Sequence, residues 1–315
     1  MIYMDRPSGR LVSKSFYVLC IMLFLSICIF PQQSDDEVIR VDSSIVVVNA
    51  VVTDKSGKPI NGLKKSDFEL YVDGNLQDIT SFSTEETPFA AVILIDASGS
   101  MEERIRIARA AAIRFLQGIR DEDVVAICSF DSKVNLLQDF SNSRDIDEVI
   151  FDLKAEGMTV LNDAIFKASA MLAERPEKRR AIIVLSDGAD TFSKISADKA
   201  LSAALGVNAI IYTIDMSSPQ ANPRERMESQ AALRRFAERS GGRFITTPGG
   251  FALQQAFKEI VSELGSQYTI VFHPSESKDE GVWHSIEVRV KREGVKVRAR
   301  EGYSSSVKNL RKPSR

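Results

Sequence analysis

The sequence predicts an α/β fold: a doubly wound, mainly parallel sheet with helices on both faces, inserted into a small all-β module built from both flanks. Three observations predict it. Between residues 88 and 265, continuous apolar runs alternate with segments of helical period, as in a parallel sheet that helices cover on both faces. Outside that stretch, apolar and polar residues alternate as in strands with one solvated face. Each flank is too short to bury a core alone, so we expect the two flanks to pair.

The composition is that of an ordinary globular protein. Of the 315 residues, 44% are hydrophobic and 27% are charged, which excludes a disordered or collagen-like chain. The formal net charge of -2 argues against a dedicated nucleic-acid binder, because such proteins carry a strong basic surplus. Three cysteines and two histidines are too few for a zinc ribbon, a His-rich metal site or a disulfide scaffold.

An export signal is predicted at the N-terminus, where residues 1–33 are assigned to a signal peptide or a short membrane anchor. Residues 16–30 are uncharged and apolar, and they follow a basic region with Arg6, Arg10 and Lys14. The run is shorter than the roughly 20 apolar residues of a spanning helix, and no A-x-A cleavage site follows it. Cleavage and retention as an anchor both stay open. The expected location is the periplasm, the cell surface or the medium.

The first flank, residues 38–83, is predicted to be all β. Its strands are rich in β-branched and aromatic residues, and turn-forming residues separate them. The expected strands are residues 44–53, 68–72 and 76–82, with an Asp-Gly turn at residues 73–74 that joins the last two as a hairpin.

The central stretch, residues 88–265, begins with the apolar run 90–95, which suits a strand buried on both faces. Further strands are expected at residues 124–130, 181–186, 208–215 and 243–246. Helices are expected at residues 105–119, 145–154, 161–174, 195–205, 230–239 and 251–264, and a long polar loop at residues 216–229. Cys128 lies within an apolar strand and is predicted to be a small buried hydrophobe, not a nucleophile.

The second flank, residues 267–303, returns to a two-residue period and is expected to pair with residues 38–83. The last residues, 304–315, are predicted to form a disordered basic tail. Two interpretations of the basic residues at the C-terminus stay open. Lys296, Arg298 and Arg300 suit the solvated face of a strand. Together with the basic residues of the tail, they could instead contact anionic lipid or cell-wall polymer.

Polar side chains with hard oxygen atoms follow the buried strands of the central stretch. Asp96, Ser98 and Ser100 come directly after the first strand. Asp187 follows the strand expected at residues 181–186, and Thr159 precedes the helix expected at residues 161–174. Any one of them suits a helix cap, but ligands of open α/β sheets bind at the carboxyl ends of the strands. Two carboxylates and three hydroxyls favour Mg²⁺, with Mn²⁺ or Ca²⁺ as alternatives, and disfavour Zn²⁺ and Cu²⁺.

The pattern D-x-S-x-S, a distant Thr and then Asp-Gly after an apolar strand resembles the von Willebrand factor type A (VWA) domain and its metal-ion-dependent adhesion site. The resemblance covers about residues 88–265 and implies a Rossmann-like fold. It also implies that the five residues of the pattern form the metal site: Asp96, Ser98, Ser100, Thr159 and Asp187. The flanks are similar to those of bacterial, acidobacterial-type exported proteins related to this family.

The charges of this residue set indicate binding, not bond cleavage. Two carboxylates only neutralise a dication, so the metal still attracts the Asp or Glu of a partner protein. A hydrolase would need a general base near these residues. Both histidines lie instead in the C-terminal β segment. We therefore expect an adhesion module and no enzyme, with a structural assembly factor as the alternative and a metal-dependent hydrolase as a distant third.

Loops at the same edge are expected to contact the partner protein. They follow the strands that carry the metal-site residues, where binding residues are often found. The sequence indicates neither the identity of the partner nor the oligomeric state. The candidate contact residues are Glu102, Asp190, Thr191, Ser193, Arg224 and Arg226.

Overall fold

The computed structural model describes residues 38–39, 45–84, 87–144, 148–218, 220–246, 250–274, 282–304 and 310–311. The predicted export segment, residues 1–33, lies outside these ranges. None of the helices within them has the length and hydropathy that crossing a bilayer requires.

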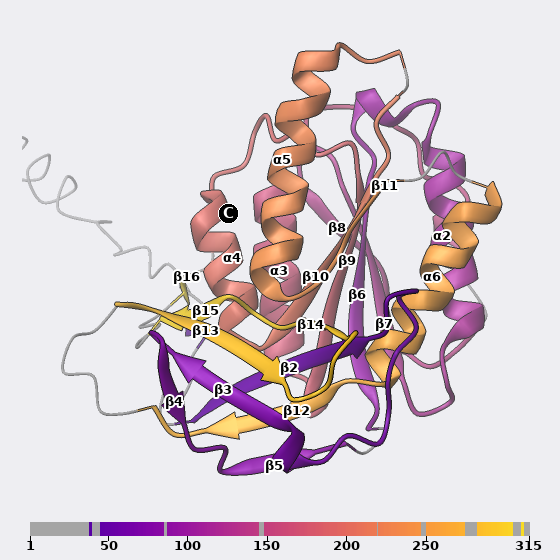
Figure 1. Ribbon diagram of the computed structural model, residues 1–315. Coiled ribbons are helices and arrows are strands. Elements are labelled where there is room, and N and C mark those ends of the chain that lie inside the picture. Colours follow the sequence, from indigo (N-terminus) through magenta and orange to yellow (C-terminus); the bar gives the residue numbers. More distant parts are fainter. Residues whose placement is uncertain are drawn as a thin grey trace, which may run out of the picture. The chain divides into compact units, whose positions relative to one another are not determined.

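A six-stranded sheet forms the centre of the α/β part (Figure 1), and its strands follow the order β11-β10-β9-β6-β7-β8. All neighbours are parallel except β8, which runs antiparallel to β7. The predicted doubly wound, mainly parallel fold is confirmed. The strands are β6 (Phe89–Asp96), β7 (Val124–Phe130), β8 (Val134–Ser141), β9 (Arg179–Ser186), β10 (Ala209–Asp215) and β11 (Phe244–Thr246).

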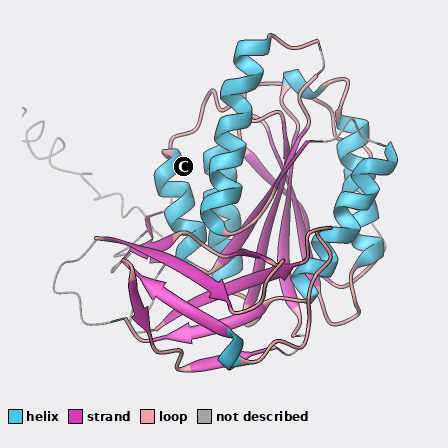
Figure 2. Ribbon diagram, in the orientation of Figure 1, coloured by secondary structure: helices cyan, strands magenta, loops and turns pink. Residues whose placement is uncertain are grey.

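Helices cover both faces of this sheet (Figure 2). They are α2 (Ile105–Gly118), α3 (Leu161–Ala173), α4 (Ala197–Gly206), α5 (Pro223–Ser240) and α6 (Gly250–Gly265). Alternate residues of β6 point into two separate cores. Ala90, Val92 and Leu94 pack with α3, α4 and α5, whereas the intervening residues pack with α2 and α6. This double burial explains why β6 reads as a continuous apolar run.

The two flanks pair with each other. Strand β12 (Tyr268–Phe272) lies antiparallel to β2 (Val46–Thr53), and β13 (Trp283–Val290) lies antiparallel to β3 (Phe68–Val72). The resulting two four-stranded sheets, β14-β2-β12-β5 and β15-β13-β3-β4, enclose a third core. Their other strands are β4 (Asn75–Gln77), β5 (Ser81–Ser83), β14 (Lys296–Arg298) and β15 (Gly302–Ser304). A short 3-10 turn, η1 (Lys65–Asp67), precedes β3.

The hairpin at residues 68–77 is confirmed, but the strand expected at residues 76–82 is wrong. Asp73 and Gly74 have φ angles of 50° and 78°, the left-handed values that a two-residue hairpin turn requires. The following segment divides into β4, which pairs with β3, and β5, which pairs with β12 in the other sheet. Two short strands with different partners look like one strand in sequence, because both keep the two-residue period.

Two further expectations within residues 88–265 are wrong, and one strand was not expected. Within residues 148–154, the described part of the helix expected at residues 145–154, the structure has the 3-10 turn η3 (Glu148–Ile150) and no α-helix, because so short a segment gains little from helix formation. The loop expected at residues 216–229 ends early, because the Asn222 side chain caps α5 and Pro223 occupies its first position. The edge strand β8 was not expected, because bulges interrupt its alternation.

Of the three basic residues expected on a solvated strand face, Lys296 is exposed, but the expectation is wrong for Arg298 and Arg300. Arg300 is 8% exposed and donates to Asn208 Oδ1 at 3.0 Å, while Arg298 donates to Glu263 Oε2 at 2.6 Å. Burial lowers the pKa of the Arg300 guanidinium to about 10. Both side chains therefore hold the second flank against the α/β part and are not available to an anionic surface. Within the predicted disordered tail, β15 includes Ser304, and β16 (Leu310–Arg311) pairs with β1 (Val38–Ile39).

Arg179 holds the segment where the chain leaves the α/β part. This residue is 1% exposed and begins β9. Its Nη1 donates to the carbonyls of Leu264 and Gly265 at 3.3 and 2.9 Å, and its Nη2 donates to the Gln267 carbonyl at 2.6 Å. The first two carbonyls lie in the last turn of α6, where no intrahelical donor is available to them, and Gln267 directly precedes β12. The cation therefore fixes the junction between α6 and β12.

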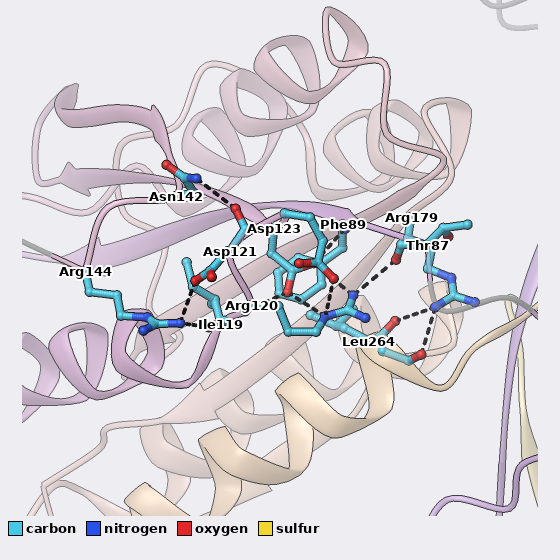
Figure 3. Close-up of polar contacts among 12 residues, drawn as sticks. Thr87, Phe89, Ile119, Arg120, Asp121, Asp123, Asn142, Arg144, Arg179 and Leu264 are labelled. Atoms are coloured by element: carbon cyan, nitrogen blue, oxygen red, sulfur yellow. Dashed lines mark hydrogen bonds and ion pairs between the residues drawn. The ribbon is translucent and has the colours of Figure 1, made fainter.

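The ion pair between Arg120 and Asp123 holds the segment where the chain enters the α/β part (Figure 3). Asp123 is completely buried, and its Oδ1 accepts hydrogen bonds from the Phe89 amide at 3.1 Å and from Arg120 Nη2 at 2.9 Å. The same Arg120 nitrogen donates to the Thr87 carbonyl at 3.2 Å. Both crossings between the β module and the inserted part are thus fixed by buried, hydrogen-bonded charges.

Cys128 is completely buried in β7, as the sequence predicts, and burial raises the pKa of its thiol to about 11. A variant in which Cys20 and Cys28 are replaced by Ser leaves it as the single thiol. In the folded protein at pH 8, we expect this thiol to react with iodoacetamide about 100-fold more slowly than an exposed cysteine, because the thiolate is scarce. The reaction should become fast in denaturant. Equal rates in both states would show that the thiol is accessible.

Candidate metal centre

The candidate centre lies at the carboxyl edge of the central sheet, after the adjacent parallel strands β6 and β9. Asp96 is the last residue of β6, and Asp187 directly follows the last residue of β9. The two strands are paired in register from Phe89 with Arg179 to Ile95 with Leu185, so both aspartates reach the same edge. This is the edge at which open α/β sheets bind ligands.

Asp96 is a buried carboxylate without a cationic hydrogen-bond donor. It is 0% exposed, and it accepts hydrogen bonds from the Ser98 amide at 2.9 Å and from Ser186 Oγ at 2.5 Å, both of them neutral. Burial, together with the nearby charge of Asp187, raises its pKa to about 6. Two neighbouring carboxylates with no positive charge between them favour a cation at this position.

The D-x-S-x-S loop presents its hydroxyls next to Asp96. Ser98 is 1% exposed, whereas Ser100 is exposed, and their Oγ atoms lie 3.1 Å apart. The short 3-10 turn η2 (Gly99–Met101) begins directly after Ser98 and directs both hydroxyls to one side. The loop thus offers two neutral oxygens beside a buried carboxylate, which is the ligand chemistry that Mg²⁺ prefers.

The loop that carries Thr159 is hydrogen-bonded to the D-x-S-x-S loop. The Gly99 amide donates to the Gly157 carbonyl at 3.2 Å, and the Glu156 amide donates to the Ala97 carbonyl at 2.8 Å. Gly157 has a φ of +83°, and a Cβ on it would lie 2.8 Å from Ser132 Oγ, so glycine is required at this close approach. These bonds place Thr159, which is 3% exposed, beside the first loop.

The loop after β9 is fixed to the same Thr159 segment. The Thr159 amide donates to Thr191 Oγ1, and the amides of Thr191 and Phe192 donate to the Thr159 carbonyl, all at 3.0 Å. Asp190 and Ser193 accept hydrogen bonds from the first amides of α3. Three of the predicted contact residues, Asp190, Thr191 and Ser193, therefore hold the loop in place through their side chains.

The remaining predicted contact residues have different environments. Glu102 is exposed two residues after Ser100. Arg224 and Arg226 lie in the first turns of α5, and the Arg224 side chain, 88% exposed, pairs with Glu228. Ser186 was not predicted as a site residue, yet its hydroxyl donates to Asp96 and accepts from the Gly188 amide at 2.9 Å. In the sequence, its position at the end of a strand and directly before Asp187 could have indicated this role.

Gly188 is a sensitive position next to Asp187. Its φ is +84°, and a Cβ would lie 2.5 Å from the Ser229 carbonyl oxygen of α5. Because the backbone and α5 would both have to shift, we expect Gly188→Ala to lower the free energy of unfolding by about 2 kcal/mol. Gly265→Ala is the matched control, since nothing lies within 4 Å of its Cβ position. Urea denaturation of both variants tests this, and equal stabilities would contradict it.

The five residues fit a hard divalent cation. They combine a buried carboxylate, a second carboxylate beside it and three hydroxyls on loops that are hydrogen-bonded to one another. Elsewhere in the described ranges, as at this edge, no group of three or more His, Cys, Asp or Glu side chains is arranged to hold a metal. The candidate centre thus depends on Ser and Thr oxygens for most of its ligands, which excludes a preference for soft metals.

The inserted α/β part is similar to known proteins. The sequence profile of the von Willebrand factor type A domain matches residues 91–189, which include every residue of the candidate centre. Inter-alpha-trypsin inhibitor heavy chain H3 of Bos taurus is 28% identical in an alignment of 115 residues that covers 32% of this chain and 13% of that protein. The chain thus corresponds to a small part of that relative.

The chain is also similar to solved structures. A von Willebrand factor type A protein from Catenulispora acidiphila has a TM-score of 0.48 and 15% identity, covering 88% of this chain and 75% of that one. The vWF domain of the type V pili tip protein Mfa5 from Porphyromonas gingivalis has a TM-score of 0.47 and 15% identity, covering 61% and 99%. The profile match identifies a von Willebrand factor type A domain within the inserted α/β part of this chain.

Proposed function

We propose that this protein binds another protein through a divalent cation held at the carboxyl edge of the VWA domain. The observation that carries the proposal is the buried, uncompensated carboxylate of Asp96, with Asp187 and three hydroxyl residues on loops that are hydrogen-bonded together. Asp96, Ser98, Ser100, Thr159 and Asp187 would hold the cation, with Mg²⁺ favoured and Mn²⁺ or Ca²⁺ as alternatives. When bound, the cation supplies a coordination position that an anionic oxygen can fill.

The residues of the site support binding and give no support to bond cleavage. A hydrolase requires a general base within hydrogen-bond reach of the reacting atoms. His284 instead lies in β13 of the β module, where Nδ1 contacts Asp73 Oδ2 at 2.7 Å. The two aspartates offset the charge of the cation but leave a coordination position open. An acidic side chain of the partner can fill that position. We therefore propose an adhesion module and no enzyme.

The apolar run at residues 16–30 and the basic residues before it support an exported protein of the bacterial envelope, in the periplasm, on the cell surface or in the medium. The basic residues of the C-terminal tail could still contact an anionic surface. Arg298 and Arg300 no longer belong to that proposal, because their side chains bind residues of the VWA domain. Nothing in the composition favours a nucleic-acid partner, given the net charge of -2.

A pull-down from a bacterial envelope extract tests the proposed function. The bait is wild type or Asp187→Ala, each with Mg²⁺ or with EDTA, and Glu103→Ala is the control for loss of an exposed carboxylate at the same edge. We expect a partner that is recovered by wild type and Glu103→Ala with Mg²⁺ and lost in the other conditions. Recovery of the partner in all conditions would refute metal-dependent binding and favour the assembly role.

A further inference from the structure

Two large apolar side chains lie exposed beside the candidate metal centre. Met158 is 47% exposed and directly precedes Thr159, and Phe192 is 54% exposed and follows Asp187 by five residues. Single exposed apolar residues are common on protein surfaces. These two differ from scattered ones because both belong to loops that carry or support the proposed metal ligands.

The backbones of both residues are fixed by hydrogen bonds. The Phe192 amide donates to the Thr159 carbonyl at 3.0 Å, and the Met158 amide donates to Ser132 Oγ at 3.1 Å. The two residues are therefore held on either side of Thr159 before any partner binds. Because the backbone at both residues is already ordered, covering them costs little further backbone entropy, so their burial contributes more fully to affinity.

The loops around the centre carry exposed side chains of both charges. Glu102, Glu156 and Asp190 are exposed on three of these loops, and Lys154 and Lys194 are exposed on two of them. Charges of both signs on these loops partly cancel for an acidic partner, so the cation is the main electrostatic attraction for its carboxylate. Next to the cation, the exposed apolar pair can add affinity through burial, which requires an apolar side chain close to the partner's carboxylate.

We propose that Met158 and Phe192 form the specificity surface of this site and bind a large apolar side chain of the partner. That side chain lies within three residues of the Asp or Glu that reaches the cation, because Met158 adjoins Thr159 and each residue of an extended segment spans about 3.3 Å. The partner is thus a protein with an exposed segment that pairs an acidic residue with Leu, Ile, Met, Phe or Trp. This inference rests on the proposed function.

Selection from a library of random peptides displayed on phage tests the proposal. The full chain is immobilised as wild type, as Met158→Ser with Phe192→Ser, as Asp187→Ala and as Leu76→Ser, each with MgCl₂ or EDTA. Leu76 is 64% exposed in β4 of the β module, so its variant controls for loss of an exposed apolar residue elsewhere. Thermal unfolding of each variant confirms that it is folded, as expected for substitutions of exposed side chains.

With MgCl₂, wild type and Leu76→Ser should select peptides with an acidic residue and an apolar residue within three positions of it. The double variant should keep the acidic preference and lose the apolar one, and a selected peptide should bind it about five-fold or more weakly. Acidic peptides without the apolar preference in wild type, or an unchanged preference in the double variant, would overturn this inference and leave the proposed function standing. Absence of metal-dependent acidic peptides in wild type would overturn both.

Discussion

Glu263→Ala is expected to lower the free energy of unfolding by about 3 kcal/mol, because it leaves two guanidinium groups without their buried counter-ion. Glu263 lies in α6 and its side chain is 1% exposed. Its Oε1 accepts from Arg243 at 2.9 Å, and its Oε2 accepts from Arg298 of β14 at 2.6 Å. The carboxylate therefore joins the last helix of the VWA domain to the β module. Urea denaturation monitored by circular dichroism measures the loss.

Two further variants separate the buried position from the loss of charge. Glu259 also pairs with Arg243, at 2.8 Å, but its side chain is 44% exposed, so Glu259→Ala should cost less than about 1 kcal/mol. Glu263→Gln keeps the shape and one strong acceptor and should fall between the two alanine variants. If Glu263→Ala proved no more costly than Glu259→Ala, the ion pairs across the junction would not stabilise the fold.

Asp96→Asn is expected to change stability and metal affinity in opposite directions. Without metal, the variant should gain about 1–2 kcal/mol, because it removes a buried charge that has no cationic partner. The new amide can donate to Ser186 Oγ while its oxygen still accepts from the Ser98 amide. Mg²⁺ affinity should fall roughly 100-fold, since the site loses one of its two charges.

The measurement is thermal unfolding at several MgCl₂ concentrations. A ligand that binds only the folded state raises stability with its concentration, by about 2.7 kcal/mol at 100 times the dissociation constant. Wild type should show this rise, and Asp96→Asn should begin higher and not respond. Glu102→Gln changes an exposed carboxylate at the same edge and should behave as wild type. A lower stability of metal-free Asp96→Asn would show that the carboxylate is structurally required.

The fold was predictable where the sequence has one dominant period. Strand β6 is buried on both faces and reads as a continuous apolar run, and the Asp73-Gly74 turn requires left-handed backbone angles that few other residue pairs adopt. The edge strand β8 was missed because it is only partly buried and its register shifts twice at bulges. Edge strands depend on the neighbouring strand more than on their own pattern.

The candidate metal residues were chosen from their residue types at strand ends, and their role as metal ligands stays a prediction. The roles of their neighbours were not predicted. Thr191 and Asp190 look like exposed polar loop residues in sequence, yet their side chains accept backbone hydrogen bonds from the Thr159 segment and from α3. Arg298 follows the two-residue period of a solvated strand face, but the insertion places Glu263 opposite it. Contacts between segments far apart in the chain are not encoded in local periodicity.

The central claim is that five residues at one sheet edge hold a divalent cation, and calorimetric titration with Mg²⁺ tests it most directly. The proteins are wild type, Asp187→Ala and Glu102→Gln, all first treated with EDTA and exchanged into metal-free buffer. We expect one Mg²⁺ to bind per chain in wild type and in Glu102→Gln, and we expect binding to be lost in Asp187→Ala. No binding in wild type, or equal binding in wild type and Asp187→Ala, would contradict it.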